Sequence, residues 1–231
     1  MPDSHPPTPV LLAWSGGKDS ALALHALRGD PAFRVEALLT TVTTGYERIS
    51  MHGVRRALLE AQAEALDLPL VEAHISPGAS NAEYEASIAK ALEPYRVAGI
   101  THIAFGDLFL ADVRAYRERQ LLALGMTGVF PLWLRDTAAL AREFIALGFR
   151  CHLAVVDPRH LDPSFAGRAF DDALLRDLPA GVDPCGENGE FHTFVSDGPI
   201  FRHSVRVSVG ELALRDGFAF CDLLPGAQAQ R

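Results

Sequence analysis

The stretch that decides the fold reads Val10-Leu11-Leu12-Ala13-Trp14-Ser15-Gly16-Gly17-Lys18-Asp19-Ser20. Its first five residues form an apolar run typical of a buried strand. Residues 21–28 are rich in helix formers, so the sequence predicts a strand, a tight turn and a helix. The two glycines let backbone N–H groups approach an anion, and the start of the helix adds unpaired donors and partial positive charge. The stretch therefore predicts a phosphate cradle, to which Ser15, Lys18 and Ser20 add donors.

This cradle differs from the two common phosphate-binding patterns. The Walker pattern requires a glycine where this chain has Leu12, and Ser or Thr where it has Asp19. The dinucleotide pattern requires a third, spaced glycine, which is absent after Gly16-Gly17. Among 21 Lys and Arg residues, only Lys18 and Lys90 are lysines. This usage indicates that the turn needs a compact ammonium group.

Composition limits the classes of protein that fit. The 231 residues are 48% hydrophobic, enough for a sizeable core in one large domain or one domain with an appendage. A net charge of −8 argues against a broad nucleic-acid surface, which needs clustered cations. We expect a cytoplasmic protein, because no run has membrane-spanning length and residues 1–9 show no secretory signal. Three widely spaced cysteines predict neither a disulfide framework nor a Cys-x-x-Cys site.

Strands and helices alternate along the first two thirds of the chain. We expect strands at 10–14, 34–40, 69–75, 101–105, 128–132 and 149–156, and helices at 21–28, 52–66, 81–97, 111–124 and 136–147. This alternation predicts an α/β fold with a Rossmann-like, mainly parallel sheet. The turn after residue 14, the loop after Thr40 and the turn Gly106-Asp107 then share the sheet edge where ligands bind.

The pattern changes near residue 157. We expect a helix at 168–178 and antiparallel strands at 191–195, 201–209 and 211–223. The chain is therefore divided into a disordered tail (1–9), an α/β domain that carries the phosphate cradle (10–156) and a smaller α+β domain (157–225).

The residues from Phe105 to Arg119 carry the first further group of polar side chains. Asp107 ends a predicted strand, where its carboxylate could orient a polar ligand or Mg²⁺. Arg114 and Arg117 share one face of the next helix and could clamp a carboxylate or phosphate, although a solvated basic face is the alternative.

The second polar stretch reads Asp183-Pro184-Cys185-Gly186-Glu187-Asn188-Gly189-Glu190-Phe191-His192-Thr193-Phe194. Its dense polar groups could bind an amine or a hydroxyl and hold a general base, whereas a hydrophilic turn before a hairpin is the alternative. Carboxylates repel a triphosphate, so we expect Glu187, Asn188 and Glu190 to contact the acceptor or the amine. His52, near the nucleotide edge, is left open as a contact or a surface residue.

Ser15 to Ser20 resemble the Ser-Gly-Gly-Lys-Asp-Ser signature of the PP-loop ATP pyrophosphatases, which split ATP between its α- and β-phosphates. Together with 105–119, Pro131-Leu132-Trp133 and 186–193, they make residues 10–201 resemble the diphthine–ammonia ligase family. Residues 186–193 follow that family's pattern of Gly-Glu-x-Gly-Glu, an aromatic residue, one further residue and Thr.

The resemblance implies that ATP adenylates a carboxylate, with release of pyrophosphate, and that ammonia displaces AMP to give an amide. The composition, with Arg preferred over Lys, is typical of GC-rich, often bacterial genomes, and bacteria lack the diphthamide-bearing elongation factor. A small-molecule carboxylate is then the expected acceptor. A PP-loop enzyme that modifies tRNA and a non-catalytic ATP-binding sensor stay open as alternatives.

Residue roles follow from these patterns and from the resemblance. We assign ATP binding to Ser15, Gly16, Gly17, Lys18, Asp19, Ser20, Thr40, Gly106 and Asp107. Acceptor binding is assigned to Arg114, Arg117, Glu187, Asn188, Glu190, His192 and Thr193. Catalysis is assigned to Lys18, Asp19 and Glu190, and Mg²⁺ binding to Asp19 and Asp107. The expected partners are the carboxylate and ammonia, without a membrane or an extended nucleic-acid surface, and a homodimer is left open.

Overall fold

The computed structural model describes residues 6–45, 48–49 and 53–226, which form two β-sheets and their helices. The strands of the first sheet are β1 (Thr8–Ala13), β2 (Phe33–Thr43), β3 (Arg48–Ile49), β4 (Leu70–Ile75), β5 (His102–Ala104) and β6 (Thr127–Val129). The second sheet contains β7 (Arg150–Val156), β8 (Phe191–Asp197), β9 (Val207–Arg215) and β10 (Phe218–Pro225). The helices are α1 (Lys18–Gly29), α2 (Arg56–Leu66), α3 (Asn81–Val97), α4 (Ala111–Ala123), α5 (Thr137–Ala146), η1 (Pro163–Phe165) and α6 (Asp172–Asp177).

The first sheet has the predicted Rossmann-like arrangement. Its parallel strands follow the order β4-β2-β1-β5-β6, and the short β3 pairs antiparallel with the C-terminal end of β2. From β1, the chain first forms β2 and β4 on one side of this strand, and it later forms β5 and β6 on the other side. The sequence therefore predicted the fold class correctly.

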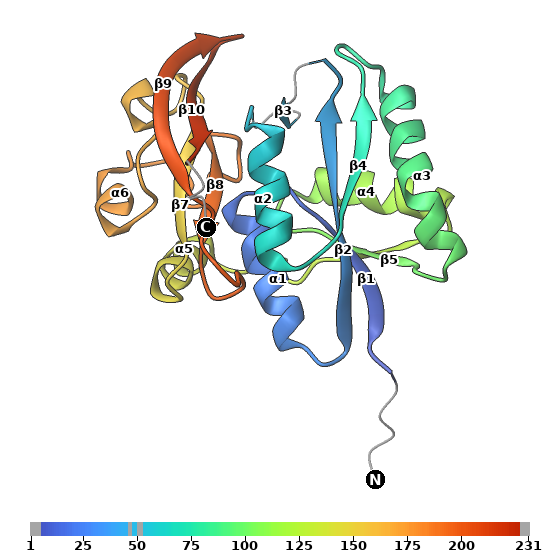
Figure 1. The fold of residues 1–231 in the computed structure, drawn as a ribbon. Helices are drawn as coiled ribbons and strands as arrows, with labels where there is room; N and C mark the ends of the chain where they lie inside the picture. The colour runs from blue at the N-terminus through green and yellow to red at the C-terminus, as the bar shows by residue number, and fades with distance from the viewer. Residues whose placement is uncertain (1–5, 46–47, 50–52, 227–231) are drawn as a thin grey trace, which may run out of the picture.

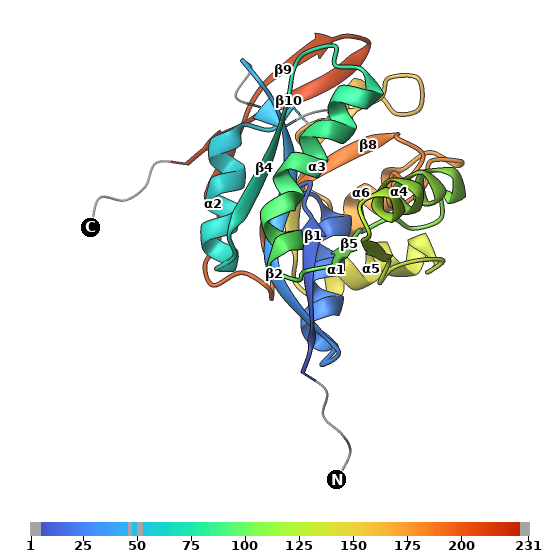
Figure 2. The same cartoon turned by 90° about the vertical axis from the view of Figure 1, so that its right-hand side faces the viewer.

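Helices α1 and α2 lie between the two sheets, whereas α3 and α4 cover the opposite face of the first sheet (Figures 1 and 2). α1 contacts β1 and β2 on one side and β8 on the other. Its residues Ala21 to Leu24 are consecutive and all buried, because a helix between two sheets has little face left for solvent. This position brings the start of α1 against the C-terminal part of the chain.

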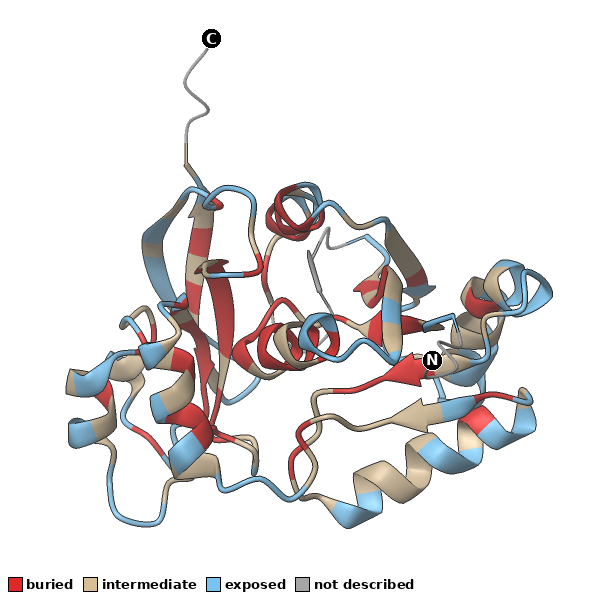
Figure 3. Cartoon of the chain, turned by 90° about the horizontal axis from the view of Figure 1, so that it is seen from below, coloured by how far each residue is buried: buried red, intermediate tan, exposed pale blue. Residues whose placement is uncertain are grey.

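Alternation along the strands divides the core in two. Val10 and Leu12 of β1 face α1 and α2, while Leu11 faces the cluster under α3 and α4. The larger cluster continues through α1 and α2 into the second sheet, and Figure 3 shows the buried residues gathered there. Within the described ranges, no helix has the length and apolarity needed to cross a membrane.

The sixth strand that we expected in the first sheet belongs to the second sheet instead. The segment predicted at 149–156 forms β7, but β7 pairs antiparallel with β8 and β10 in the second sheet. Strand alternation alone does not tell which sheet a strand joins, since periodicity reports burial and not pairing partners. The division of the chain into folding units at 9/10 and 156/157 stays a prediction, and residues 1–5 of the expected tail lie outside the described residues.

The C-terminal hairpin has its turn at a different place from the predicted one. β9 and β10 are antiparallel, as expected, but they meet at Asp216-Gly217, and Gly210 lies inside β9. Asp216 and Gly217 both have positive φ, of 50° and 82°, as a two-residue type I′ hairpin turn requires. An Asp-Gly pair is a stronger hairpin-turn signal than a single glycine inside a strand pattern, such as Gly210.

Candidate active site

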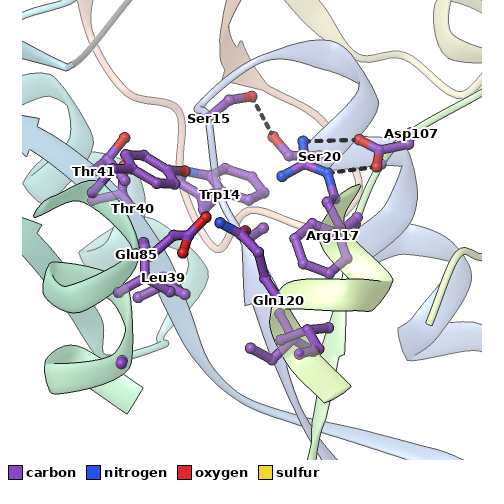
Figure 4. A pocket seen from close by; sticks show the side chains of 18 of the residues that line it. Trp14, Ser15, Ser20, Leu39, Thr40, Thr41, Glu85, Asp107, Arg117 and Gln120 are labelled. Carbon is purple, nitrogen blue, oxygen red and sulfur yellow. Dashed lines mark hydrogen bonds and ion pairs between the residues drawn. The ribbon is translucent and has the colours of Figure 1, made fainter. Parts of the chain in front are cut away.

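The strand order of the first sheet reverses between β1 and β5, and a cleft of about 710 Å³ opens at the C-terminal ends of these strands. Trp14 and Ser15 follow β1, and Leu39 to Thr41 belong to β2. Glu85 of α3 and Gln120 of α4 lie on opposite sides of the cleft (Figure 4). The structure thus brings the three predicted strand-end segments together at one edge.

Hydroxyl groups inside the loop 15–20, which we call the phosphate loop, hold its conformation. Gly17 N donates to Ser15 Oγ at 3.2 Å, Ser20 Oγ donates to the Gly17 carbonyl at 2.9 Å, and the two hydroxyl oxygens lie 3.2 Å apart. Gly16 has φ of 77°, a conformation that favours glycine. Gly17 precedes the first residue of α1, so the loop ends at a helix N-terminus, as an anion site requires.

Gly106 allows the turn after β5 to pack directly on the phosphate loop. A Cβ atom at this position would lie 2.7 Å from the carbonyl carbon of Asp19 and 3.0 Å from Ser20 N. These neighbours are backbone atoms, so a side chain at Gly106 would have to displace the phosphate loop.

The buried ammonium group of Lys18, a residue of the phosphate loop, lines a second, smaller cavity. Its Nζ donates to both carboxylate oxygens of Asp19, at 2.8 and 2.9 Å, and to the Cys185 carbonyl. Burial by itself would lower the pKa of Lys18, but the nearby acidic groups, with Asp19 the main one, together outweigh burial and raise this pKa above its ordinary value. Lys18 is therefore a fixed positive charge.

The smaller cavity, of about 100 Å³, lies between the phosphate loop and residues 183–190, which we call the acidic loop. Its lining includes Gly17 and Lys18 from the first loop and Gly186 and Gly189 from the second. Four residues line both this cavity and the large cleft: Ser15, Asp19, Glu187 and His192. The two spaces therefore adjoin, and a ligand in one lies next to a ligand in the other.

Glu187 is the acidic-loop carboxyl group that faces both cavities. Leu108 N donates to its Oε1 at 2.8 Å. Burial raises the pKa of Glu187 to about 7, and the nearby carboxylates Asp19 and Asp107 act in the same direction. A carboxyl group with this pKa can accept and return a proton at neutral pH.

The Glu190 side chain does not line either cavity, as its predicted role in acceptor binding and catalysis would require. Its buried carboxylate accepts hydrogen bonds from Asp183 N, Asn188 N and Asn188 Nδ2, each at 3.0 Å. Burial would raise the pKa of Glu190, but these donors outweigh it and lower the pKa. Glu190 and Asn188 line neither cavity, because their polar groups pair with each other and with the loop backbone. The structure therefore places neither side chain on a cavity wall, and their contacts with the acceptor stay a prediction.

The two predicted arginines separate in the structure. Arg117 lines the cleft and pairs with Asp107, whereas Arg114 lies outside it and packs over the rings of Phe130 and Trp133, at 4.5 and 4.7 Å from their centroids. Arg114 also pairs with Glu118 at 2.8 Å. Of the predicted clamp, only Arg117 is in position.

Thr193 and Thr40 both lie at the site. Thr193 Oγ1 accepts a hydrogen bond from Lys18 N at 3.0 Å, which joins β8 to the phosphate loop. The Thr40 side chain lines the cleft, and its buried Oγ1 has no hydrogen-bond partner among the described residues. A buried hydroxyl without a partner is costly, so a polar ligand atom at this position would be stabilising. His52, the other nucleotide contact considered, lies outside the described residues.

Two residues that line the cleft and one residue behind the phosphate loop were missed from the sequence. Glu85 and Gln120 line the cleft and are linked through the Tyr116 hydroxyl, which donates to Glu85 Oε1 at 3.2 Å and accepts from Gln120 Nε2 at 2.7 Å. Gln62 is fully buried behind the phosphate loop. It lies on the apolar stripe of α2, one turn from Leu58 and from Leu66, and this polar residue on an apolar stripe was the available signal.

The Cys185 thiol is not a candidate nucleophile. Burial raises the pKa of this thiol to about 12, and its Sγ donates to the Thr137 carbonyl at 3.3 Å. All three cysteines are buried and free, as the spacing predicted.

Oxygen ligands for Mg²⁺ are present but few. Asp19 and Asp107 line the cleft, and carboxylates are the donors that Mg²⁺ prefers. In the described part of the chain, no three or more His, Cys, Asp or Glu side chains gather into a group that could hold a metal ion. Asp19 and Asp107 could therefore supply oxygen ligands to Mg²⁺, which would need further ligands from outside these two side chains.

Comparison with known proteins gives one consistent result. Residues 8–127 match the diphthamide synthase N-terminal domain, and residues 136–224 match the diphthamide synthase C-terminal domain. Proteins named diphthine–ammonia ligase from Danio rerio and Homo sapiens are 32% and 33% identical over 48% of this chain. The Schizosaccharomyces pombe protein of that name is 24% identical over 93% of the chain. The chain spans less than half the length of these relatives, at 46%, 44% and 38%.

Proposed function

The chain belongs to the diphthamide synthase family, and from this membership we propose that it is an ATP-dependent ligase that converts a carboxylate into an amide with ammonia. The observation that carries the proposal is the shared wall of the two cavities. Glu187 is part of this wall, together with Ser15 and Asp19 of the phosphate loop, and Lys18 lines the small cavity beside it.

The reaction has two steps that this arrangement supports. The acceptor carboxylate attacks the α-phosphorus of ATP, and pyrophosphate leaves with the electrons of the broken P–O bond. Ammonia then attacks the acyl carbon, AMP leaves, and one proton is released. Adenylation is needed because a free carboxylate is a poor acyl donor.

Lys18 and the start of α1 suit the first step. Their positive charge and N–H donors would stabilise the charge that develops on pyrophosphate. Thr40, with its unpaired hydroxyl, is proposed to contact the nucleoside. Asp19 and Asp107 would hold Mg²⁺, which supplies charge neutralisation at the phosphates when bound.

Glu187 suits the second step. With a pKa of about 7, it could take the proton that the attacking amine releases. His192 lines both cavities beside it and is retained as an acceptor contact. Arg117 is retained for binding the acceptor carboxylate or a phosphate.

The acceptor is proposed to be a small-molecule carboxylate. The sizes of the cavities support this proposal, since the cleft of about 710 Å³ must also hold ATP and the adjoining cavity measures only about 100 Å³. A cytoplasmic location, a homodimer and the lack of an extended nucleic-acid surface stay predictions.

The proposal is tested by analysing products. Purified protein is incubated with ATP, Mg²⁺, ammonium and a panel of carboxylic acids, and nucleotides are separated by chromatography. We expect AMP and pyrophosphate in equal amounts, together with an amide. ADP as the only product would contradict the proposal, and tight ATP binding without turnover across the panel would favour the sensor alternative.

A further inference from the structure

The side-chain amide of Gln62 is fully paired although it is completely buried. Its Oε1 accepts from Trp14 Nε1 at 2.9 Å, and its Nε2 donates to the Gly16 carbonyl at 3.0 Å and to the Val195 carbonyl at 2.5 Å. The indole can only donate and the carbonyls can only accept, so these partners fix which amide atom is oxygen.

The Gly16 carbonyl receives a second hydrogen bond on the same side. Val195 N donates to it at 2.8 Å, so both acceptor positions of this oxygen are used. The peptide bond between Gly16 and Gly17 is trans, so its N–H points away from its carbonyl. Gly17 N accordingly faces Ser15 Oγ, and Gly17 itself lines the small cavity.

We infer that Gln62 is a positioning residue that sets the orientation of the Gly16–Gly17 peptide and thereby holds the Gly17 N–H, which donates to Ser15 Oγ in this structure, where a nucleotide phosphate can take the place of that hydroxyl as its acceptor. This inference rests on the proposed ATP binding at the phosphate loop. Gln62 lines neither cavity and acts from behind the loop. Its bond to Val195 also ties the same peptide to β8, the strand that follows the acidic loop.

Without Gln62, the peptide would keep only the Val195 N–H as a restraint on its carbonyl. The hydrogen bond from Gly17 N to Ser15 Oγ, at 3.2 Å, would remain, but neither Gly16 nor Gly17 has a side chain that limits rotation of the peptide between them. A peptide that samples two orientations presents its N–H to the phosphate only part of the time. Phosphate affinity then falls while contacts to the nucleoside, which lie elsewhere in the cleft, stay the same.

The test compares ligands that differ in their phosphates. Affinities for ATP, pyrophosphate and adenosine are measured by calorimetry for the wild type and for Gln62→Met, which keeps the volume and removes the donors. We expect ATP and pyrophosphate to bind about tenfold more weakly, the scale of one hydrogen bond to a charged group. Adenosine affinity should change by less than about twofold, because adenosine lacks the phosphates that this bond contacts.

The matched control is Arg28→Met. Arg28 also joins buried segments through carbonyls, donating to Leu66 O at 2.7 Å and Ile200 O at 2.6 Å, but it does not touch the phosphate loop. We expect this variant to lose thermal stability while keeping its affinity for pyrophosphate. Equal losses of pyrophosphate affinity in both variants would show that any destabilisation of the fold weakens pyrophosphate binding, and this result would overturn the inference.

The outcomes separate this inference from the proposed function. A wild type that binds neither ATP nor pyrophosphate overturns the proposed function. A wild type that binds both, with unchanged affinities in Gln62→Met, overturns the role of Gln62 alone. If Gln62→Met does not fold, the same affinities are measured for Gln62→Glu. This variant keeps an acceptor for Trp14 but places an oxygen against the two carbonyls. If neither folds, pyrophosphate must slow hydrogen exchange at Gly17 in the wild type, and unchanged exchange overturns the inference.

Discussion

Asp107 and Arg117 form a two-pronged ion pair at the cleft, with Nε to Oδ2 at 2.6 Å and Nη2 to Oδ1 at 3.1 Å (Figure 4). The guanidinium also lies 4.5 Å from the centre of the Phe105 ring. A planar group held at its edge and on its face has one orientation before any ligand binds. Asp107 follows β5 and Arg117 lies in α4, so this pair connects the strand end with the helix that forms one side of the cleft.

Arg117→Lys should lower kcat/KM for ATP-dependent amide formation by about tenfold or more, because an ammonium group can neither form the paired bonds to Asp107 nor stack on Phe105. Arg114→Lys is the matched control, since Arg114 is on the same helix and stacks on aromatic rings outside the cleft. Steady-state kinetics of both variants would check this. Equal losses of kcat/KM in the two variants would show that both arginines only stabilise the fold.

Lys18→Arg should be as inactive as Lys18→Met. The Lys18 side chain is 3% exposed and fills the space between Asp19, the Cys185 carbonyl and the Phe191 ring. The larger guanidinium cannot take that place without moving the acidic loop. Loss of this charge should lower kcat by about 10²- to 10³-fold, the range for one preorganised electrostatic group. Single-turnover measurement of pyrophosphate release would check it, and full activity in Lys18→Arg would show that any cation suffices.

The rate of amide formation should rise with pH through about 7 when it is expressed per concentration of free ammonia. The pKa of Glu187 is raised to about 7, so this carboxyl group is protonated below that pH and able to accept a proton above it. In Glu187→Gln, this limb of the pH–rate profile should disappear. Correction for free ammonia is essential, because the fraction of unprotonated ammonia also increases with pH. A limb that persists in the variant would assign the titration to another group.

Much of the fold could be predicted because local signals agreed with it. The capping box at the start of α3, where Ser80 and Glu83 bond each other's backbone, follows from the sequence pattern. Gly16 and Gly17 marked the turn after β1 in the same way. The sheet joined by β7 could not be predicted, since that depends on pairing with β8, about 35 residues later in the chain.

The site was harder to predict than the fold. Sequence patterns identified the phosphate loop, Asp107 and Glu187, because each follows a predicted strand or lies in a dense polar loop. They did not distinguish Arg114 from Arg117, which share a helix face but differ in the aromatic rings and the carboxylates that they contact. They also assigned catalysis to Glu190 and not to Glu187, three residues earlier, although the Glu187 carboxyl group faces the cavities and that of Glu190 turns inward. Side-chain direction in a loop depends on which donors the folded backbone presents.

Two substitutions in the acidic loop should change stability in opposite directions. Glu190→Gln should destabilise the protein by about 1–3 kcal/mol at neutral pH, because its amide NH₂ would replace one of two oxygens that each accept a backbone N–H, from Asp183 at Oε1 or from Asn188 at Oε2. The pKa of Glu190 is lowered in the folded state, so its charge stabilises the fold above its ordinary pKa of 4.5. The difference from the wild type should therefore shrink as pH falls below that value.

Glu187→Gln is the internal control, since its pKa is shifted the other way. A carboxyl group whose folded pKa is raised from 4.5 to about 7 loses stability as pH rises between these values. Removing its charge should leave the protein more stable than the wild type above about pH 7 and unchanged below about pH 4. Thermal denaturation of the wild type and both variants across this range would check both signs. If the two variants shifted in the same direction at neutral pH, the opposite environments assigned to these two glutamates would be wrong.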